Sequence, residues 1–275
     1  MEPIEITKQE FEAAIHAAAI CDDTIFDAVK PYIDRSTREV ERILLTTGAD
    51  AIAGNSTLGS AVKNYLCEVG FLKAIRHLDL VLTDAGFGVV HNDHIAPASA
   101  ERVNNLEEAL LLAADRSRCD IIRILITIDG WGREKKATHI VNVLLWDIVE
   151  AVDMCGVEKL THAAWVKLQK DIFDAEFKLA LVLGYEVLTE LLLATVQNTI
   201  SDIQGLAIQI VKTAVANLIA NNGNEQMQRN VKSRVIQWFD KHKDDFSSYT
   251  ASSEYRARQE KPYENRKDSP AYFFG

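Results

Sequence analysis

Apolar residues recur every three or four positions along most of this 275-residue chain, a spacing typical of amphipathic α-helices. Capping residues precede several of these patterns, and Thr7 with Glu10 three positions later has the spacing of a capping box. Pro31 falls inside the second pattern, where we expect a kink or a restart. The sequence therefore predicts a mainly α fold made of multi-helix bundles. The expected helices cover residues 7–20, 22–45, 55–77, 99–128, 161–183, 185–196 and 201–219, with a last helix ending near residue 243.

Residues 137–154 fit two interpretations. Ile140, Leu144 and Ile148 have the spacing of a buried helix. The β-branched residues of 140–146 also permit a strand. Of the two, we expect the helix.

The stretch from Leu78 to Ser99 departs from the helical pattern. Leucines at 78, 80 and 82 alternate with other residues, which is the two-residue period of a half-buried strand. Gly86 closes a three-residue turn at a position that needs a positive φ, and residues 87–90 make the return strand. We expect a β-hairpin at about residues 78–91 that projects from the helical body. Its apolar side chains, Phe87, Val89 and Val90, are candidates for a protein interface.

The composition changes again from Ser247 onward, where serines, charged residues and two prolines replace the helical spacing. Such a segment buries too little to order itself. It nevertheless ends in Tyr272, Phe273 and Phe274, a cluster that is unfavourable in water. We therefore expect an extended C-terminal arm, residues 247–275, whose aromatic end binds a protein surface.

Gly130 and Gly132 lie in the strongest helix-breaking segment, residues 129–133, and mark a boundary. The expected domains are 1–130, helical with the hairpin, and 131–246, also helical, followed by the arm. Residues 29–44 can be aligned with residues 166–181. The two halves would then be a weak duplication, although helical spacing alone also produces such matches.

Charge and cysteine content narrow the classes of function. The net charge is −10, which disfavours a general binder of nucleic acid or of anionic membranes. The four cysteines form no C-x-x-C pair, so we expect neither structural zinc nor a disulfide framework. The first residues are acidic and lack the apolar run of a signal peptide. A cytoplasmic protein is expected, with no membrane partner and no sequence-specific nucleic-acid partner.

Three groups of polar residues are candidate sites. His91 and His94 would need further metal ligands from elsewhere, so a polar loop is the favoured interpretation. The two G-x-G motifs, at 86–88 and 130–132, lack the third glycine of a dinucleotide loop, which leaves phosphate binding at Arg133, Lys135 and Lys136 the weaker alternative. Glu186 and Glu190 fit an exposed strip better than an acid–base pair. We predict no catalytic residue, no metal ligand and no cofactor. Of the tryptophans, Trp165 and Trp238 are expected in the interior.

Two segments resemble an uncharacterised family encoded by phages and prophages of gut Bacteroidetes. They are L-D-L-V-L-T-D-A-G-F-G-V-V-H-N-D-H-I-A-P-A-S-A-E-R-V, Leu78 to Val103, and E-N-R-K-D-S-P-A-Y-F-F-G, Glu264 to Gly275. The resemblance implies a non-enzymatic virion-assembly protein of the head–tail connector or neck type, which acts as a ring of copies. Its partners would be itself and other virion proteins such as portal or tail components. It would be found in the bacterial cytoplasm and, if the phage is active, in the virion.

Two other classes of function stay open. One is an intracellular helical protein that binds a small ligand or has a regulatory role, with its site between the two helical halves. The other is a helical hydrolase whose site has no familiar motif. A deep polar pocket that gathers His91, His94 or Glu186 would favour either of them.

Overall fold

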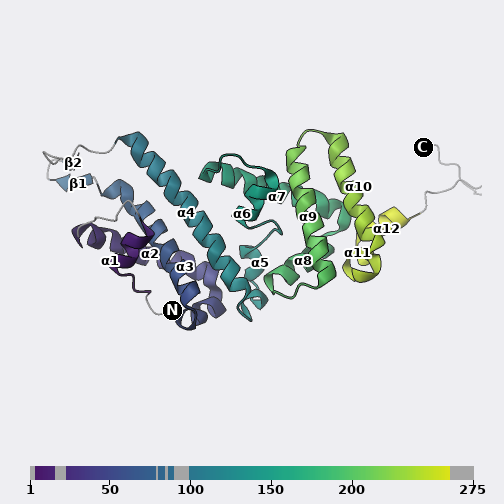
Figure 1. Cartoon of the computed structure of the whole chain (residues 1–275), viewed down its shortest axis with the longest axis horizontal. Helices are drawn as coiled ribbons and strands as arrows, with labels where there is room; N and C mark the ends of the chain where they lie inside the picture. Colours follow the sequence, from purple (N-terminus) through teal and green to yellow (C-terminus); the bar gives the residue numbers. More distant parts are fainter. Residues whose placement is uncertain (1–3, 16–22, 79, 84–85, 90–98, 261–275) are drawn as a thin grey trace, which may run out of the picture.

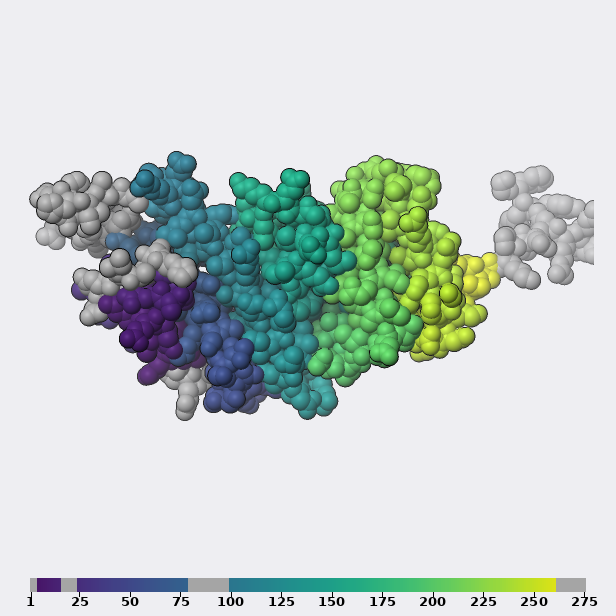
Figure 2. All heavy atoms as spheres, viewed as in Figure 1, coloured from purple at the N-terminus to yellow at the C-terminus, as the bar shows by residue number. Residues whose placement is uncertain are grey.

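The structure is a computed structural model that describes residues 4–15, 23–78, 80–83, 86–89 and 99–260. The fold is mainly α, as the sequence predicts. Figure 1 shows the helices following the chain along the long axis of the molecule, from α1 (Lys8–Ala14) near one end to α12 (Ser253–Gln259) near the other. In Figure 2 the atoms of successive elements adjoin one another along this axis, from α1 to α12. The chain therefore builds one elongated body.

Three long helices, α2 (Asp23–Ala51), α3 (Ser56–Ala74) and α4 (Ala100–Ile126), pack side by side, and α1 lies against the first two. Their starts confirm the predicted caps. The side chains of Thr7, Asn55 and Ser99 accept hydrogen bonds from backbone N–H groups in the first turns of α1, α3 and α4. Helix α1 ends at Ala14, earlier than the predicted end at residue 20. Short 3₁₀ turns follow α2 and α3, η2 (Ile52–Gly54) and η3 (Ile75–His77).

Helix α2 runs through Pro31 without the restart that the sequence allowed, and its interruption lies at Leu45. Leu45 has φ 57° and ψ −161°, a backbone conformation that residues with a side chain rarely adopt. The helix then continues to Ala51, past its predicted end. Such a conformation persists only where the surrounding structure stabilises it.

Two side chains from a distant segment satisfy backbone groups on either side of this break. The indole N–H of Trp131 donates to the carbonyl oxygen of Ile43 over 3.2 Å. On the other side, the carboxylate of Glu134 accepts hydrogen bonds from the backbone N–H of Thr47, at 2.7 Å, and of Thr46, at 3.3 Å. Glu134 therefore acts as the N-cap of the second part of α2, although it lies in another part of the chain.

The second half of the chain contains most of the predicted helices. Thr161 and Ser201 cap α7 and α9 through their side chains, and Gly184 separates α7 from α8 with a φ of 103°. The elements are η4 (Trp131–Arg133), α5 (Ala137–Ile140), α6 (Ile148–Cys155), α7 (His162–Leu183), α8 (Tyr185–Val196), α9 (Asp202–Ala220), α10 (Glu225–Lys241), η5 (Lys243–Asp245), α11 (Ser247–Ala251) and α12.

Residues 137–154 form neither the continuous helix nor the strand that the sequence allows. Two short helices, α5 and α6, flank an irregular segment at 141–147. Within this segment the backbone N–H of Leu144 donates to both carboxyl oxygens of Glu176, at 3.2 and 3.0 Å. A tertiary hydrogen bond here takes the place of a helical one.

Buried apolar side chains form two clusters that meet near the middle of the chain. Trp146 and Leu192 pack against both clusters. The first cluster reaches past the predicted boundary at 130, since it includes Trp131, Val141 and Val196. The division into domains at that point stays a prediction. Large members of the first cluster are Phe11, Leu44, Leu66, Ile121 and Trp131, and of the second Trp165, Leu179, Val211, Phe239 and Tyr249.

The first part of the predicted C-terminal arm is helical, so an extended arm from Ser247 was wrong. Helices α11 and α12 cover residues 247–259, and Phe246, Tyr249 and Ser252 are buried. The Tyr249 hydroxyl donates to Asp240 over 2.7 Å and accepts from Arg258 over 2.8 Å. Phe246 and Tyr249 are buried in the second core beside Phe239, whose ring centre lies 5.3 Å from that of Tyr249. Burial of these three aromatic side chains compensates for the weak helical pattern of residues 247–259.

Two short strands, β1 (Leu80–Thr83) and β2 (Gly86–Val89), lie beyond η3 at the end of the molecule that holds α1 (Figure 1). They pair antiparallel, with Leu80 opposite Val89 and Thr83 opposite Gly86. Residues 84–85 and 90–98 lie outside the described residues, and only the backbone of the strands is described. The projecting hairpin, with its contact side chains, stays a prediction.

Helix α9 is the one helix within the described ranges whose length and apolar content would suffice to cross a membrane. Core helices of water-soluble proteins meet the same criterion. In the structure 44% of the apolar stretch of α9 is buried, and the helix packs against α7 and α10.

Candidate interaction surface on α7 and α8

Helix α7 has a second apolar face, which points to solvent. Its inner face buries Trp165, Ile172 and Leu179. On the outer face Phe173, Phe177 and Leu181 follow one another at intervals of four residues and are 50%, 46% and 53% exposed. Solvated helical faces are normally polar, so this apolar row is a candidate interaction surface.

The first residue of α8 extends this apolar row. Gly184 ends α7 with a positive φ, which a glycine adopts without strain, and the chain turns directly into α8. Tyr185 is therefore placed beside Phe177, with ring centres 5.9 Å apart and an edge-to-face angle of 67°. Tyr185 is itself 49% exposed. We call Phe173, Phe177, Leu181 and Tyr185 the α7–α8 surface.

A pocket of about 140 Å³ opens within this surface. Most of its walls are apolar, and the aromatic rings of Phe173, Phe177 and Tyr185 form its rim. A cavity of about 150 Å³ lined by apolar side chains is known to accept benzene. The pocket therefore has the volume of one aromatic side chain. It is lined by Asn142, Val143, Phe173, Glu176, Phe177, Ala180, Tyr185, Leu188, Thr189 and Leu192.

Glu176 is the ionisable group of the pocket. It is buried, and both its oxygens accept from the Leu144 N–H. Burial raises the pKa of this carboxyl to about 7, although the hydrogen bond from Leu144 and the charge of Lys212 act in the opposite direction. Lys212 is ion-paired with Glu150 at 2.6 Å. Below pH 7 the Glu176 carboxyl in the pocket is therefore mainly protonated and uncharged.

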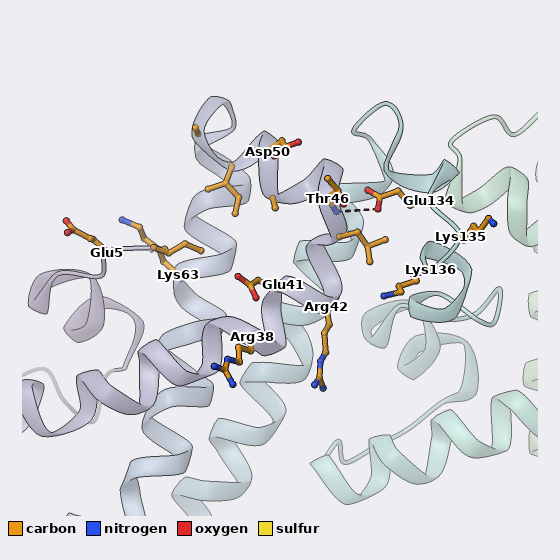
Figure 3. A pocket seen from close by; sticks show the side chains of 15 residues that line it. Glu5, Arg38, Glu41, Arg42, Thr46, Asp50, Lys63, Glu134, Lys135 and Lys136 are labelled. Carbon is orange, nitrogen blue, oxygen red and sulfur yellow. Dashed lines mark hydrogen bonds between the residues drawn. The ribbon is translucent and has the colours of Figure 1, made fainter. Parts of the chain in front are cut away.

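A second, much larger depression lies between α2 and the segment that holds Glu134 (Figure 3). It is a wide groove of about 1700 Å³ that includes the strained Leu45. In Figure 3 Arg38 and Arg42 point to the same side of α2. Lys135 and Lys136, two of the residues weighed for phosphate binding, also line it. Its charges are mixed, since the cationic residues Arg38, Arg42, Lys63, Lys135 and Lys136 alternate with Glu5, Glu41, Asp50 and Glu134.

The G-x-G motif at 130–132 has a packing role. Trp131 is fully buried in the first core, and Gly130 adopts a positive φ of 91° just before it. A Cβ atom at Gly132 would lie 2.1 Å from the carbonyl oxygen of Val196, so only glycine allows α8 to approach this closely. Gly132 is therefore explained by its close contact with Val196, and Gly130 by its positive φ.

Glu186 and Glu190, the candidate acid–base pair, lie in different surroundings. Glu186 is exposed on α8. Glu190 accepts hydrogen bonds from the Gln204 amide, at 3.1 Å, and from the Ser248 hydroxyl, at 2.5 Å. It therefore joins α8 to the start of α9 and to α11. Within the described ranges no group of three or more His, Cys, Asp or Glu side chains is arranged to hold a metal ion.

The other predicted site residues fall on or beyond the limits of the described chain. Gly86, Phe87 and Val89 lie in β2, whose backbone alone is described. Val90, His91 and His94 lie outside the described residues, as do Tyr272, Phe273 and Phe274. Trp165 is buried, as expected, and Trp238 is partly buried in the second core.

The α7–α8 surface was not predicted from the sequence, because apolar residues at helical spacing were expected in the core. In α7 the row of residues at core spacing includes Ile172 and Leu179. Phe173, Phe177 and Leu181 do not belong to that row. Those three are themselves spaced four apart. The signal for the surface was therefore a second apolar row on a helix that already had one.

The model of a "Family of unknown function (DUF6712)" matches residues 31–137, which is less than half of the chain. The matched part runs from within α2 through α4 to the start of α5, so the α7–α8 surface lies outside it. No curated protein and no solved structure matches the chain.

Proposed function

We propose that this chain is a non-enzymatic structural protein of a phage or prophage, a head–tail connector or neck component that works as a ring of copies. The observation that supports an assembly role best is the α7–α8 surface. The resemblance of Leu78–Val103 and Glu264–Gly275 to a phage and prophage family supplies the viral context. The proposed partners are further copies of this chain and virion proteins such as portal or tail components.

Four apolar side chains of this surface, Phe173, Phe177, Leu181 and Tyr185, are about half exposed. Complete burial of such a side chain contributes roughly 1.5–3 kcal/mol. Since about half of each side chain is already covered, an assembly partner that covers the rest would gain about 1 kcal/mol from each. Together these gains are enough for a specific contact within a larger interface.

Two further contact elements belong to the same proposal. The first is the hairpin, with Phe87, Val89 and Val90 as contact residues. The second is the end of the chain, with Tyr272, Phe273 and Phe274. A ring needs at least two different contact sites on each copy, because each subunit binds one neighbour on either side.

The pocket also bears on the ligand-binding alternative. Sites for small molecules are typically clefts of about 300–1,000 Å³. The pocket in the α7–α8 surface has about 140 Å³ and one rim of aromatic rings. Its size therefore favours a side chain of another protein over a metabolite.

The test is the mass of the assembled protein, measured by light scattering and sedimentation velocity across a range of concentrations. The chain is measured alone and mixed with the portal and neck proteins encoded in the same phage genome. We expect an oligomer or a mixed complex from the wild-type chain. A Phe173→Ser, Phe177→Ser double variant should weaken that association about tenfold or more, since both side chains are central to the surface.

Leu206→Ser is the matched control, because Leu206 is also exposed, at 58%, and lies on α9, outside the α7–α8 surface and its pocket. It should leave the association unchanged. Thermal unfolding verifies that the variants stay folded, as expected for residues that are half exposed. A wild-type chain that remains a monomer in every mixture would refute the assembly proposal.

A further inference from the structure

We propose that the pocket of the α7–α8 surface receives one aromatic ring from the Tyr272–Phe274 cluster of a neighbouring copy. This inference rests on the proposed function, since it requires that copies of the chain associate. It adds the identity of the occupant, namely the C-terminal segment, residues 261–275. The contact would join two different regions of the chain, a donor segment and an acceptor pocket.

The volume and chemistry of the pocket favour an aromatic occupant. About 140 Å³ is close to the space that benzene occupies in an apolar protein cavity. Phe173, Phe177 and Tyr185 at its rim can make edge-to-face contacts with an incoming ring, as Phe177 and Tyr185 already do with each other. Leu188 and Leu192 on α8 form an apolar part of the pocket wall.

The C-terminal segment supplies aromatic rings and little else that is apolar. Residues 261–275 contain four aromatic side chains, Tyr263, Tyr272, Phe273 and Phe274, among charged residues and two prolines. A segment of this composition buries too little to fold by itself. Three consecutive aromatic residues in such a context are typical of a segment that binds a surface formed elsewhere.

The attachment point of the segment lies beside the α7–α8 surface. The guanidinium of Arg258, in α12, donates to the backbone carbonyl oxygen of Val182 near the end of α7. The same guanidinium lies over the ring of Tyr249, 5.5 Å from its centre, so the end of α12 is held in place. Ser252 lies against Gly184, between α7 and α8.

The length of the segment allows it to reach another copy. Twelve residues separate Gln259 from Tyr272. At about 3.3 Å per extended residue they span roughly 40 Å, which is more than the length of α7. A donor segment and an acceptor pocket on different surfaces make a heterologous contact, and contacts of this type form a ring when the rotation between neighbouring copies closes.

The position of the ring can be tested by photo-crosslinking in the full chain. The photoreactive residue p-benzoyl-phenylalanine replaces Phe273, and this protein is mixed with an equal amount of ¹⁵N-labelled wild-type chain. We expect crosslinks to residues that line the pocket, on peptides that contain 142–143 or 173–192 and carry the ¹⁵N label. Crosslinks confined to the same copy, or located elsewhere on the surface, would overturn the inference.

Substitutions on the two sides of the contact give a second measurement. Replacing Tyr272, Phe273 and Phe274 together by alanine should weaken association about tenfold. Thr189→Trp, at an exposed residue of the pocket wall, should have a similar effect because the indole fills the space. Tyr263→Ala and Thr189→Ser are the matched controls and should leave association unchanged.

These results separate the inference from the proposed function. If the triple alanine variant assembles as tightly as the wild type, the occupant is wrong while the assembly role stands. If the wild type does not assemble with itself or with the virion proteins, both are wrong.

Discussion

Glu176 shows how a single buried carboxyl makes stability depend on pH. Its pKa is about 7 in the folded chain, whereas an unburied carboxyl of this type has a pKa of 4.5. Between these values the folded chain keeps a proton that the unfolded chain releases. The stability contribution is therefore complete below pH 4.5 and is lost as the pH rises through 7. The loss is about 3 kcal/mol by the relation of 1.36 kcal/mol per pKa unit.

A Glu176→Gln variant tests this expectation. The glutamine oxygen can still accept from the Leu144 N–H, and the side chain has no charge at any pH. Relative to the wild type, the variant should gain about 3 kcal/mol of unfolding free energy between pH 4.5 and pH 8. Urea unfolding at both values measures the difference.

Glu68 is a second buried carboxyl that provides an independent comparison for this measurement. Burial between α3 and α4 also raises its pKa to about 7, against a hydrogen bond from Ser117. Glu68→Gln should therefore remove a separate part of the same pH dependence, with both parts adding in the double variant. Wild-type and Glu176→Gln stabilities that change in parallel with pH would contradict the assignment.

At the scale of elements, the break in α2 depends on residues from outside the helix. The carboxylate of Glu134 bonds the N–H groups of Thr46 and Thr47 at the point where the helix restarts after Leu45. Burial would raise the pKa of Glu134, but the hydrogen bonds from Thr47 and Thr46 outweigh it and leave the pKa below its ordinary value. The second part of α2 thus has an N-cap supplied by tertiary structure.

Glu134→Ala should therefore destabilise the chain by about 1–2 kcal/mol, the usual effect of removing a helix N-cap. The measurement is the free energy of unfolding in urea. Lys135→Ala, at the neighbouring exposed position, is the control and should change it by less than about 0.5 kcal/mol. Equal effects from the two variants would show that the cap does not stabilise the helix.

At the scale of the whole molecule, the last helices belong to the folded body. Tyr249 is fully buried in the second core, and its hydroxyl bonds both Asp240 and Arg258. Residues 261–275, by contrast, are proposed to act only when another copy is present. The two parts of the chain beyond Phe246 should therefore respond differently to truncation.

A chain that stops after Glu260 should melt at the same temperature as the full chain under dilute conditions. A chain that stops after Phe246 should lose several kcal/mol, because it exposes the core around Phe239 and removes the buried Tyr249. Calorimetry of the two truncated proteins measures both effects. A similar melting temperature for all three chains would show that α11 and α12 do not contribute to the core.

Local sequence determined where most helices begin. Thr7, Asn55, Ser99, Thr161 and Ser201 each cap a helix through a hydrogen bond to a backbone group three residues away. Such interactions depend on neighbours in the sequence, so the mainly α fold could be predicted without knowledge of the packing.

Tertiary structure alone decided the features that involve distant residues. The strain at Leu45 is compensated by Trp131 and Glu134, and no pattern within α2 indicates it. Residues 247–259 become helical because the second core buries Tyr249, although their own spacing is weak. Phe177 is exposed because the opposite face of α7 already fills the core. In each case the deciding free energy comes from contacts between residues far apart in the sequence, which periodicity does not encode.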